Sequence, residues 1–179
     1  MNTASSLLKR DHRNVEALFD EYRFAAPDSK RTILENITRE LTKHMLAEEG
    51  VLYPVLRTFV PDGETLMKDA VEEHKEAKGL LAELENAEGG SFEMDSKVAT
   101  LRRAIDHHVR EEEGEIFPKM EQMLGATRLE ELGAEIESAK QFAPNRPPAS
   151  ASEDSPGTSI AGMATAAVDR LKNAVSGKH

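Results

Sequence analysis

Two short stretches of the sequence are copies of each other, and each places a histidine and a glutamate where they could bind a metal ion. The first reads HMLAEEGVLYP over residues 44–54, and the second reads HVREEEGEIFP over residues 108–118. In each copy a glutamate follows the histidine by four residues, so in a helix both side chains project from one face. The two pairs are His44 with Glu48 and His108 with Glu112.

A histidine upstream of each copy extends the repeat. His12 in DHRNVEALF and His74 in EHKEAKGLL each follow an acidic residue and precede two large apolar residues by six and seven positions. The chain up to about residue 120 therefore consists of two similar halves. Each half offers two histidines and one glutamate, which predicts a two-metal centre on a pseudo-twofold axis.

A structural role for these residues is the alternative, because a single histidine on an apolar helix face is usually a core residue. Here four histidines and two glutamates fall on the apolar stripes of predicted helices. Two ionised carboxylates in a helical core would each be costly to bury without partners. A pair of divalent or trivalent ions would supply the missing positive charge, which favours the metal centre.

The ligand types also indicate the metal. Two histidines and one carboxylate per half, without sulfur, are the ligands of non-haem iron, and they leave coordination positions open. A structural zinc ion needs only four ligands in a closed site. The spacing does not separate iron from manganese, so manganese is the alternative. Glutamates from facing helices could bridge the two ions.

Neighbouring residues leave two choices open. His107 with Glu111 has the same spacing as His108 with Glu112, but aligning the two copies on the prolines that end them selects His108. The glutamates that follow the ligand candidates, Glu49 and Glu113, could hydrogen-bond a ligating imidazole, act as alternative ligands, or lie on a solvated face. The solvated face is the more common role for such residues.

Four long amphipathic helices are predicted to carry these residues. They cover residues 3–24, 28–59, 64–88 and 95–123, and turn signals at 60–63 separate the second from the third. Pro54 should kink the second helix. The predicted inward side of the third contains Met67, Val71, His74, Lys78, Leu81 and Leu84. Short connections between long helices predict an all-α, antiparallel up-down four-helix bundle.

The chain divides by composition into four parts. Residues 1–125 form the predicted bundle, 126–142 a short additional helix, and 143–158 a linker rich in proline, serine and alanine. Residues 159–176 have apolar positions at helical spacing and form a predicted C-terminal amphipathic helix. This helix could fold back on the bundle, pair with a second subunit in a homodimer, or remain disordered.

Composition excludes several classes of partner and site. The net charge of −10 repels phosphate backbones, so nucleic acid is an improbable partner. The absence of cysteine excludes disulfides, iron–sulfur clusters and thiolate sites, and it fits a reducing compartment. No apolar run resembles a signal peptide or spans a bilayer, so we predict a soluble, cytoplasmic protein without membrane contact.

The combined pattern resembles the hemerythrin-like family, the HHE cation-binding domain, over residues 5–125. The likeness is carried by LYP and FP after the two repeats and by six residues: His12, His44, Glu48, His74, His108 and Glu112. The resemblance implies a four-helix bundle around an oxo- or hydroxo-bridged diiron centre that binds dioxygen, hydrogen peroxide or nitric oxide.

Two departures from this family bear on function. Oxygen-carrying hemerythrins have a second histidine four residues after the third-helix histidine, where this chain has Lys78. They also use an aspartate five residues after the fourth-helix histidine, where this chain offers Glu112 at four. One iron therefore lacks an imidazole, and water, Lys78 or the phenolate of Tyr53 could fill the gap.

Tyr53 is a possible ligand with a geometric objection. On an ideal helix it lies about 7.5 Å beyond Glu48 and about 140° around the axis. A kink at Pro54 could bring it to the centre, whereas the equivalent Phe117 cannot ligate. A phenolate ligand would stabilise the ferric state and so disfavour reversible oxygen carriage.

The leading expectation is therefore a diiron enzyme that disproportionates or reduces hydrogen peroxide in a catalase-like reaction. Lys78, Glu49 and Tyr53 are the candidates for general acid or base. The alternative is a sensor or storage module for dioxygen, nitric oxide or iron, in which the C-terminal segments transmit the state of the centre. A purely structural acidic bundle is the third hypothesis.

Overall fold

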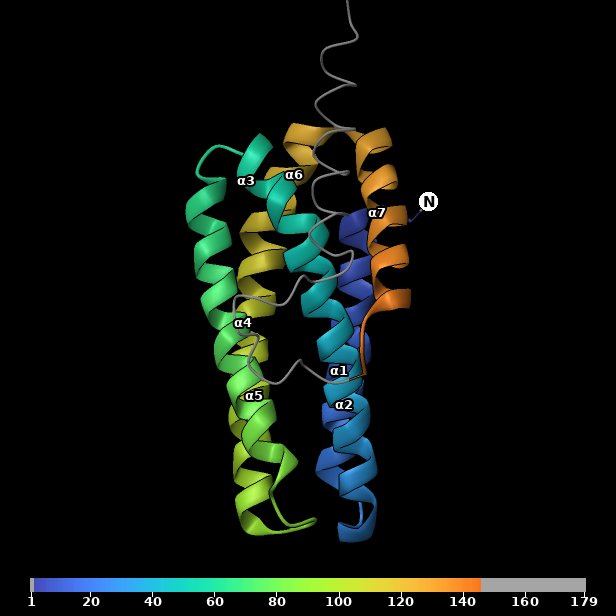
Figure 1. Ribbon diagram of the computed structural model, residues 1–179, viewed down its shortest axis with the longest axis vertical. Helices are drawn as coiled ribbons and strands as arrows, with labels where there is room; N and C mark the ends of the chain where they lie inside the picture. The colour runs from blue at the N-terminus through green and yellow to red at the C-terminus, as the bar shows by residue number, and fades with distance from the viewer. Residues whose placement is uncertain (1, 146–179) are drawn as a thin grey trace, which may run out of the picture.

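The computed structural model describes residues 2–145, which form an elongated bundle of helices without strands in that range (Figure 1). In chain order the elements are α1 (Ala4–Phe24), α2 (Pro27–Ala47), η1 (Glu48–Leu52), α3 (Tyr53–Phe59), α4 (Gly63–Glu85), α5 (Phe92–Glu111), η2 (Glu112–Ile116), α6 (Phe117–Leu124) and α7 (Ala126–Phe142). The prediction of an all-α bundle with an additional helix is confirmed.

Two helical hairpins make up the bundle. The α1–α2 hairpin and the α4–α5 hairpin lie side by side, with their tight connections at the same end (Figure 1). Thr3 caps α1 and Ser91 caps α5, because each side chain accepts a hydrogen bond from a backbone N–H in the first turn. At the α3–α4 turn, Gly63 is required because a Cβ there would collide with the Leu56 carbonyl.

A π-helical turn stands where the sequence predicts a kink. Proline cannot donate a backbone hydrogen bond, and its ring collides with the carbonyl four residues back in an α-helix. In η1, directly before Pro54, the Tyr53 N–H instead bonds to the carbonyl of Glu48, five residues back. The same turn, η2, precedes Pro118. Each turn accommodates one extra residue in an otherwise continuous helical path.

The inward face of α4 differs from the prediction at two positions. Ala70, His74 and Ala77 are buried, and Leu81 and Leu84 continue this stripe. Val71 is 39% exposed and the Lys78 side chain is 31% exposed, so their placement on the inward side was wrong. Both sets of positions flank His74 at helical spacing. The structure buries Ala70 and Ala77, leaves Val71 exposed, and leaves Lys78 half-buried at the edge of the inward face.

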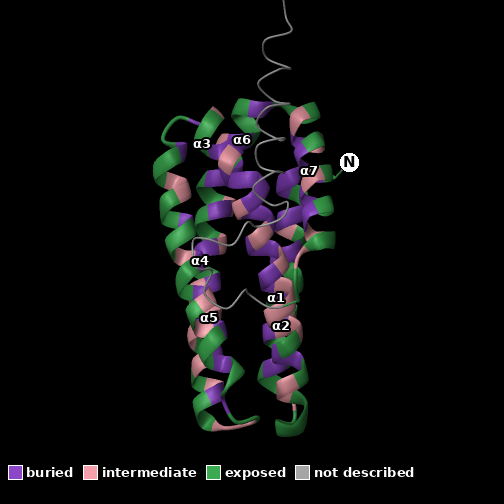
Figure 2. Ribbon diagram, viewed as in Figure 1, coloured by how far each residue is buried: buried purple, intermediate pink, exposed green. Residues whose placement is uncertain are grey.

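The core consists of two apolar clusters with a polar layer between them. One cluster joins the start of α1 to η1, α3, α6 and α7, and the other fills the end of the bundle near the hairpin connections. On α1, Leu8 belongs to the first cluster, Val15 to the second, and His12 lies between them. Buried residues line the inner faces and are dense where α7 joins the bundle (Figure 2). The candidate ligands occupy the layer between the clusters.

Helix α7 packs against α1, α2 and η1, on one hairpin of the bundle (Figure 1). It buries Leu129, Leu132 and Ile136 on its inner face. The predicted helix over residues 159–176, most of the predicted linker and the predicted homodimer contact lie outside the described residues, and the proposed domain division stays a prediction. None of the described helices is long and apolar enough to cross a membrane.

We expect the packing of α7 to contribute to global stability. Ile136 is fully buried, so Ile136→Ala should lower the free energy of unfolding by roughly 2–5 kcal/mol, as measured by urea denaturation. Ser138→Ala, at an exposed position of the same helix, should change it by less than about 0.5 kcal/mol. Equal stability of the two variants would show that α7 is not docked.

Candidate metal centre

Four histidines and two glutamates from both hairpins converge in the polar layer. His12 comes from α1, His44 from α2, His74 from α4 and His108 from α5, while Glu48 and Glu112 begin the two π-turns. None of the six is more than 5% exposed. The structure therefore brings together all six residues that the repeat singles out.

The imidazoles form two pairs, one from each half of the repeat. The Nε2 atoms of His12 and His44 lie 3.2 Å apart, and those of His74 and His108 lie 3.1 Å apart. Each imidazole therefore directs Nε2 at its partner and at the middle of the bundle. This arrangement reproduces in space the twofold relation of the sequence.

The two carboxylates lie between these pairs. Glu48 places Oε1 3.1 Å from His44 Nε2 and Oε2 3.3 Å from His74 Nε2. Glu112 places Oε2 3.3 Å from His12 Nε2 and 3.5 Å from His108 Nε2. Each glutamate thus reaches a histidine of its own half and one of the other half. Such positions suit carboxylates that bridge two ions.

A carboxylate also faces the outer nitrogen, Nδ1, of each imidazole: Glu113 at His12 (2.8 Å), Glu49 at His74 (2.8 Å), Glu73 at His108 (2.7 Å) and Asp11 at His44 (3.6 Å). A carboxylate at Nδ1 favours the tautomer with its proton there, which leaves a lone pair on Nε2. The inner nitrogens are therefore arranged as ligands.

Buried polar atoms without hydrogen-bond partners indicate that the cluster is suited to a bound cation. Glu48 Oε1, Glu48 Oε2 and Glu112 Oε2 are buried without a hydrogen-bond partner among the described residues. Lone pairs on paired nitrogens and on these oxygens repel one another, and burying them unsatisfied is costly. Cations between them would remove both costs. The imidazole and carboxylate donors fit iron or manganese.

In the metal-free protein, protons supply part of this positive charge. Burial acts to lower the pKa of His44, but Glu48 and Asp11 outweigh it and raise that pKa to about 10. Burial likewise acts to raise the pKa of Glu48, but His44 and His74 hold it well below its usual range. Metal binding must displace the proton on His44, which couples metal uptake to proton release.

Tyr53 lies at the centre, contrary to the geometric objection. Its hydroxyl donates to Glu112 Oε1 at 3.1 Å and lies 3.2 Å from His74 Nε2, and its side chain is 1% exposed. The objection assumed an α-helix. In the π-turn the fifth residue takes the place above Glu48 that the fourth would hold. The equivalent Phe117 stacks on the His12 ring at 5.9 Å.

Glu49 and Glu113 surround the centre and hydrogen-bond its imidazoles, and Lys78 lies beyond Glu49. Lys78 Nζ bonds both oxygens of Glu49 at 2.6 and 2.8 Å, and Glu49 bonds His74. Of the roles considered for Glu49 and Glu113, the structure shows hydrogen bonding to an imidazole. His107 points outward, with 57% of its side chain exposed, 3.3 Å from Glu73 Oε1.

Sequence reasoning gave no role to Asp11 and Glu73. The signal was present, because an acidic residue directly precedes His12 and His74 in the repeat. In the fold each acid turns to the other histidine of its own half: Asp11 faces His44 and Glu73 bonds His108. The facing helix, which the sequence alone does not place, decides this pairing.

Residues 3–120 match the family profile described as the hemerythrin HHE cation binding domain. The chain belongs to the hemerythrin HHE cation-binding family. The predicted resemblance is thus confirmed, and the domain is a metal-binding one. The crystal structure of an HHE cation-binding domain-containing protein from Mycobacterium kansasii is similar in fold, with a TM-score of 0.69 and 19% identity over 96% of this chain and 93% of that one.

Two sequence relatives differ in how much of their length this HHE chain covers. A hemerythrin-like protein of Schizosaccharomyces pombe is 23% identical over 97% of this chain and 86% of its own length. A DNA nickase of Nostoc sp. is 30% identical over 75% of this chain, which spans only 38% of the nickase. The nicking activity therefore belongs to a much longer protein.

The raised pKa of His44 predicts a pH-dependent stability of the metal-free protein. A folded pKa of about 10, against an ordinary value near 6.5, contributes stability that is fully present below about pH 6.5 and is lost as pH rises through about 10. We expect the free energy of unfolding to fall by roughly 2–5 kcal/mol between pH 6.5 and 10, measured by urea denaturation. His44→Gln should reduce this fall. An identical pH profile for the two proteins would contradict the assignment.

Proposed function

We propose that this HHE domain holds two iron ions joined by an oxo or hydroxo bridge and disproportionates hydrogen peroxide. One observation carries the proposal: two imidazole pairs lie on either side of two shared carboxylates, with the Tyr53 hydroxyl against one pair. Manganese is the alternative metal, because the same donor atoms suit it.

The geometry suggests a ligand role for each residue. His12 and His44 would hold one ion, His74 and His108 the other, and Glu48 and Glu112 would bind both. Tyr53 would complete the second set, where oxygen-carrying hemerythrins have the additional histidine. Two iron ions there would take up and return the electrons that convert two molecules of H2O2 into two of water and one of dioxygen.

The surrounding side chains hold protons and orient the donors. In the metal-free protein Tyr53 keeps its proton in a hydrogen bond to Glu112 Oε1, and burial together with Glu112 raises the pKa of its hydroxyl well above the usual value. Lys78 neutralises Glu49, which fixes the His74 ring. Lys78 therefore supports a ligand through a carboxylate, and Tyr53 would release its proton on binding iron.

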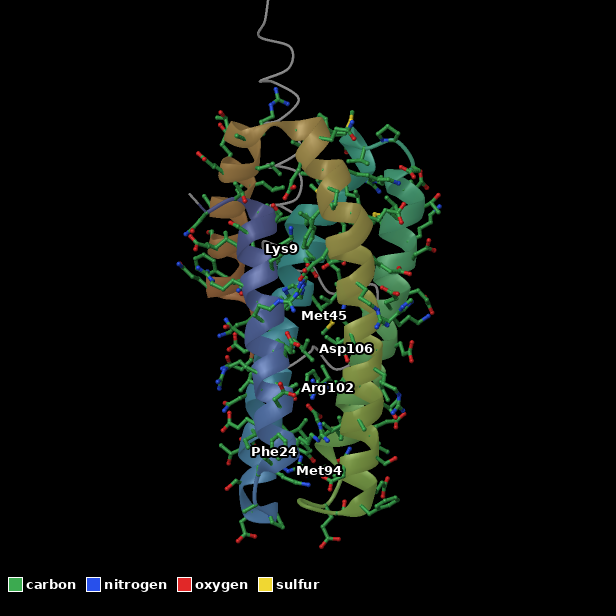
Figure 3. All side chains as sticks on the ribbon, turned by 180° about the vertical axis from the view of Figure 1, so that it is seen from behind. Lys9, Phe24, Met45, Met94, Arg102 and Asp106 are labelled. Carbon is green, nitrogen blue, oxygen red and sulfur yellow. The ribbon has the colours of Figure 1, made fainter. Side chains whose placement is uncertain are left out.

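A small apolar cavity lies beside the centre. It has a volume of about 10 Å³ and is bounded by His12, His44, His108, Asp11, Val15, Leu41, Met45, Ile105 and Val109. This volume suits one water-sized molecule. A surface groove of about 510 Å³ between α1 and α5 shares His12, Ile105 and Val109 with the cavity. Met45 lies at mid-height of the bundle, between α1 and α5 in the view of Figure 3.

The peroxide proposal predicts oxygen evolution from H2O2 by the iron-loaded protein. His44→Ala removes a ligand donor and should lower this rate by more than about 100-fold in an oxygen-electrode assay. His107→Ala, a change of the exposed neighbour of His108, should retain the rate within about threefold. Wild-type protein that contains two iron ions yet evolves no oxygen and oxidises no donor would refute the proposal.

Ligation by Tyr53 predicts a visible absorption band. The ferric protein should show phenolate-to-iron charge transfer at a longer wavelength than the oxo-to-iron bands in the near ultraviolet. Tyr53→Phe should abolish the long-wavelength band, while Tyr22→Phe, a change of the other tyrosine, should preserve it. If the wild-type spectrum lacks this band, Tyr53 acts as a hydrogen-bond donor only.

A sensor is the second candidate function, and one contact favours it. Lys140 on α7 bonds Asp11 beside His44, so the centre is linked to the helix that precedes the C-terminal segments. A sensor would bind dioxygen or nitric oxide reversibly, with a spectral change and without turnover of peroxide.

A further inference from the structure

The distance from the outer nitrogen, Nδ1, to the facing carboxylate differs among the four imidazoles. At His12, His74 and His108 the distance from Nδ1 to the facing carboxylate is 2.7 to 2.8 Å. At His44 it is 3.6 Å, and this Nδ1 is buried without a hydrogen-bond partner among the described residues. His44 is therefore the imidazole with the longest and weakest outer contact, an ion pair with Asp11 without a hydrogen bond.

Two features account for the gap at His44. Asp11 is one methylene shorter than Glu73, its counterpart in the repeat. Lys140 Nζ also bonds both oxygens of Asp11 at 2.6 Å each, and so holds the carboxylate toward α7. Asp11 is almost as buried as the ligand candidates, and the Lys140 side chain is 20% exposed, so bulk water screens this ion pair only in part.

The other half shows that a lysine alone does not break such a contact. Lys78 bonds both oxygens of Glu49, yet Glu49 still bonds His74 Nδ1 at 2.8 Å. The longer glutamate reaches both partners at once, whereas the shorter aspartate meets only the lysine. The difference therefore arises from the combination of Asp11 with a lysine that projects from α7.

We propose that Lys140 is a positioning residue that makes the His12–His44 half the weaker of the two metal sites. This rests on the two-ion centre of the proposed function. A carboxylate at Nδ1 fixes a ligating ring and raises its basicity, and loss of such a partner typically costs 10–100-fold in metal affinity. At His44 no hydrogen bond at Nδ1 fixes the ring while Lys140 holds Asp11 at 3.6 Å from that nitrogen. Docking of α7 thus determines which ion exchanges first.

Release of Co²⁺ from the loaded full-length protein tests this inference. With excess EDTA, the absorbance of bound Co²⁺ should fall in two phases, the faster one from the His12–His44 half. Lys140→Met keeps most of the side-chain length but frees Asp11 to bond His44, so the fast phase should slow by about tenfold. Asp11→Glu should slow it similarly with Lys140 in place, because the longer arm reaches both partners.

Matched variants separate positioning from general effects on stability. Lys140→Arg should behave like wild type, and Lys97→Met, which breaks an ion pair with Glu83 between α4 and α5 away from the centre, should leave both phases within about threefold. Glu73→Asp should accelerate the slow phase. By NMR of the Zn²⁺-loaded protein, the His44 ring N–H should exchange with solvent more slowly in Lys140→Met and in Asp11→Glu, an effect that loss of stability would not produce.

Three results would overturn the inference: release in a single phase, faster release from Lys140→Met, or equal effects of Lys140→Met and Lys97→Met. Each leaves the two-ion centre intact, because the wild-type protein must first take up two equivalents of Co²⁺. Failure of that uptake would contradict the proposed function and this inference together.

Discussion

The constraint on which the structure depends is the repulsion among lone pairs directed into the middle of the bundle. Four Nε2 atoms and the carboxylates of Glu48 and Glu112 meet in a layer closed by apolar clusters on both sides. Such a layer is destabilising unless positive charge enters it. Protonated His44 supplies some of that charge in the metal-free protein, and metal ions supply it in a cation-binding domain.

The repeat and its prolines determine how the layer is assembled. Each proline leaves one carbonyl of the preceding helix without its usual partner, and each π-turn accommodates this; the turns begin at Glu48 and Glu112. The extra residue in η1 turns Tyr53 toward Glu112 and His74. Local backbone chemistry at Pro54 therefore decides which side chain of the following helix faces the centre.

The sequence was sufficient for the bundle and for the six converging residues, because the helical stripes and the repeat are local patterns. It was insufficient where packing against a neighbouring helix decides which side chains face the centre. Tyr53 was doubtful only because an unbroken α-helix was assumed. Val71 and Lys78 were placed inward because both possible stripes through His74 have helical spacing. The contact of Lys140 with Asp11 joins residues 129 positions apart, and no periodicity reveals such a contact.

The aromatic positions after the two π-turns break the symmetry of the repeat. On one side the Tyr53 hydroxyl touches the inner nitrogen of His74, and on the other Phe117 lies flat against His12. A hydroxyl can donate a hydrogen bond or, once deprotonated, bind a metal cation, whereas a hydrocarbon ring can do neither. Two ions held in this layer would therefore carry unequal ligand charge, although the residues around them repeat closely.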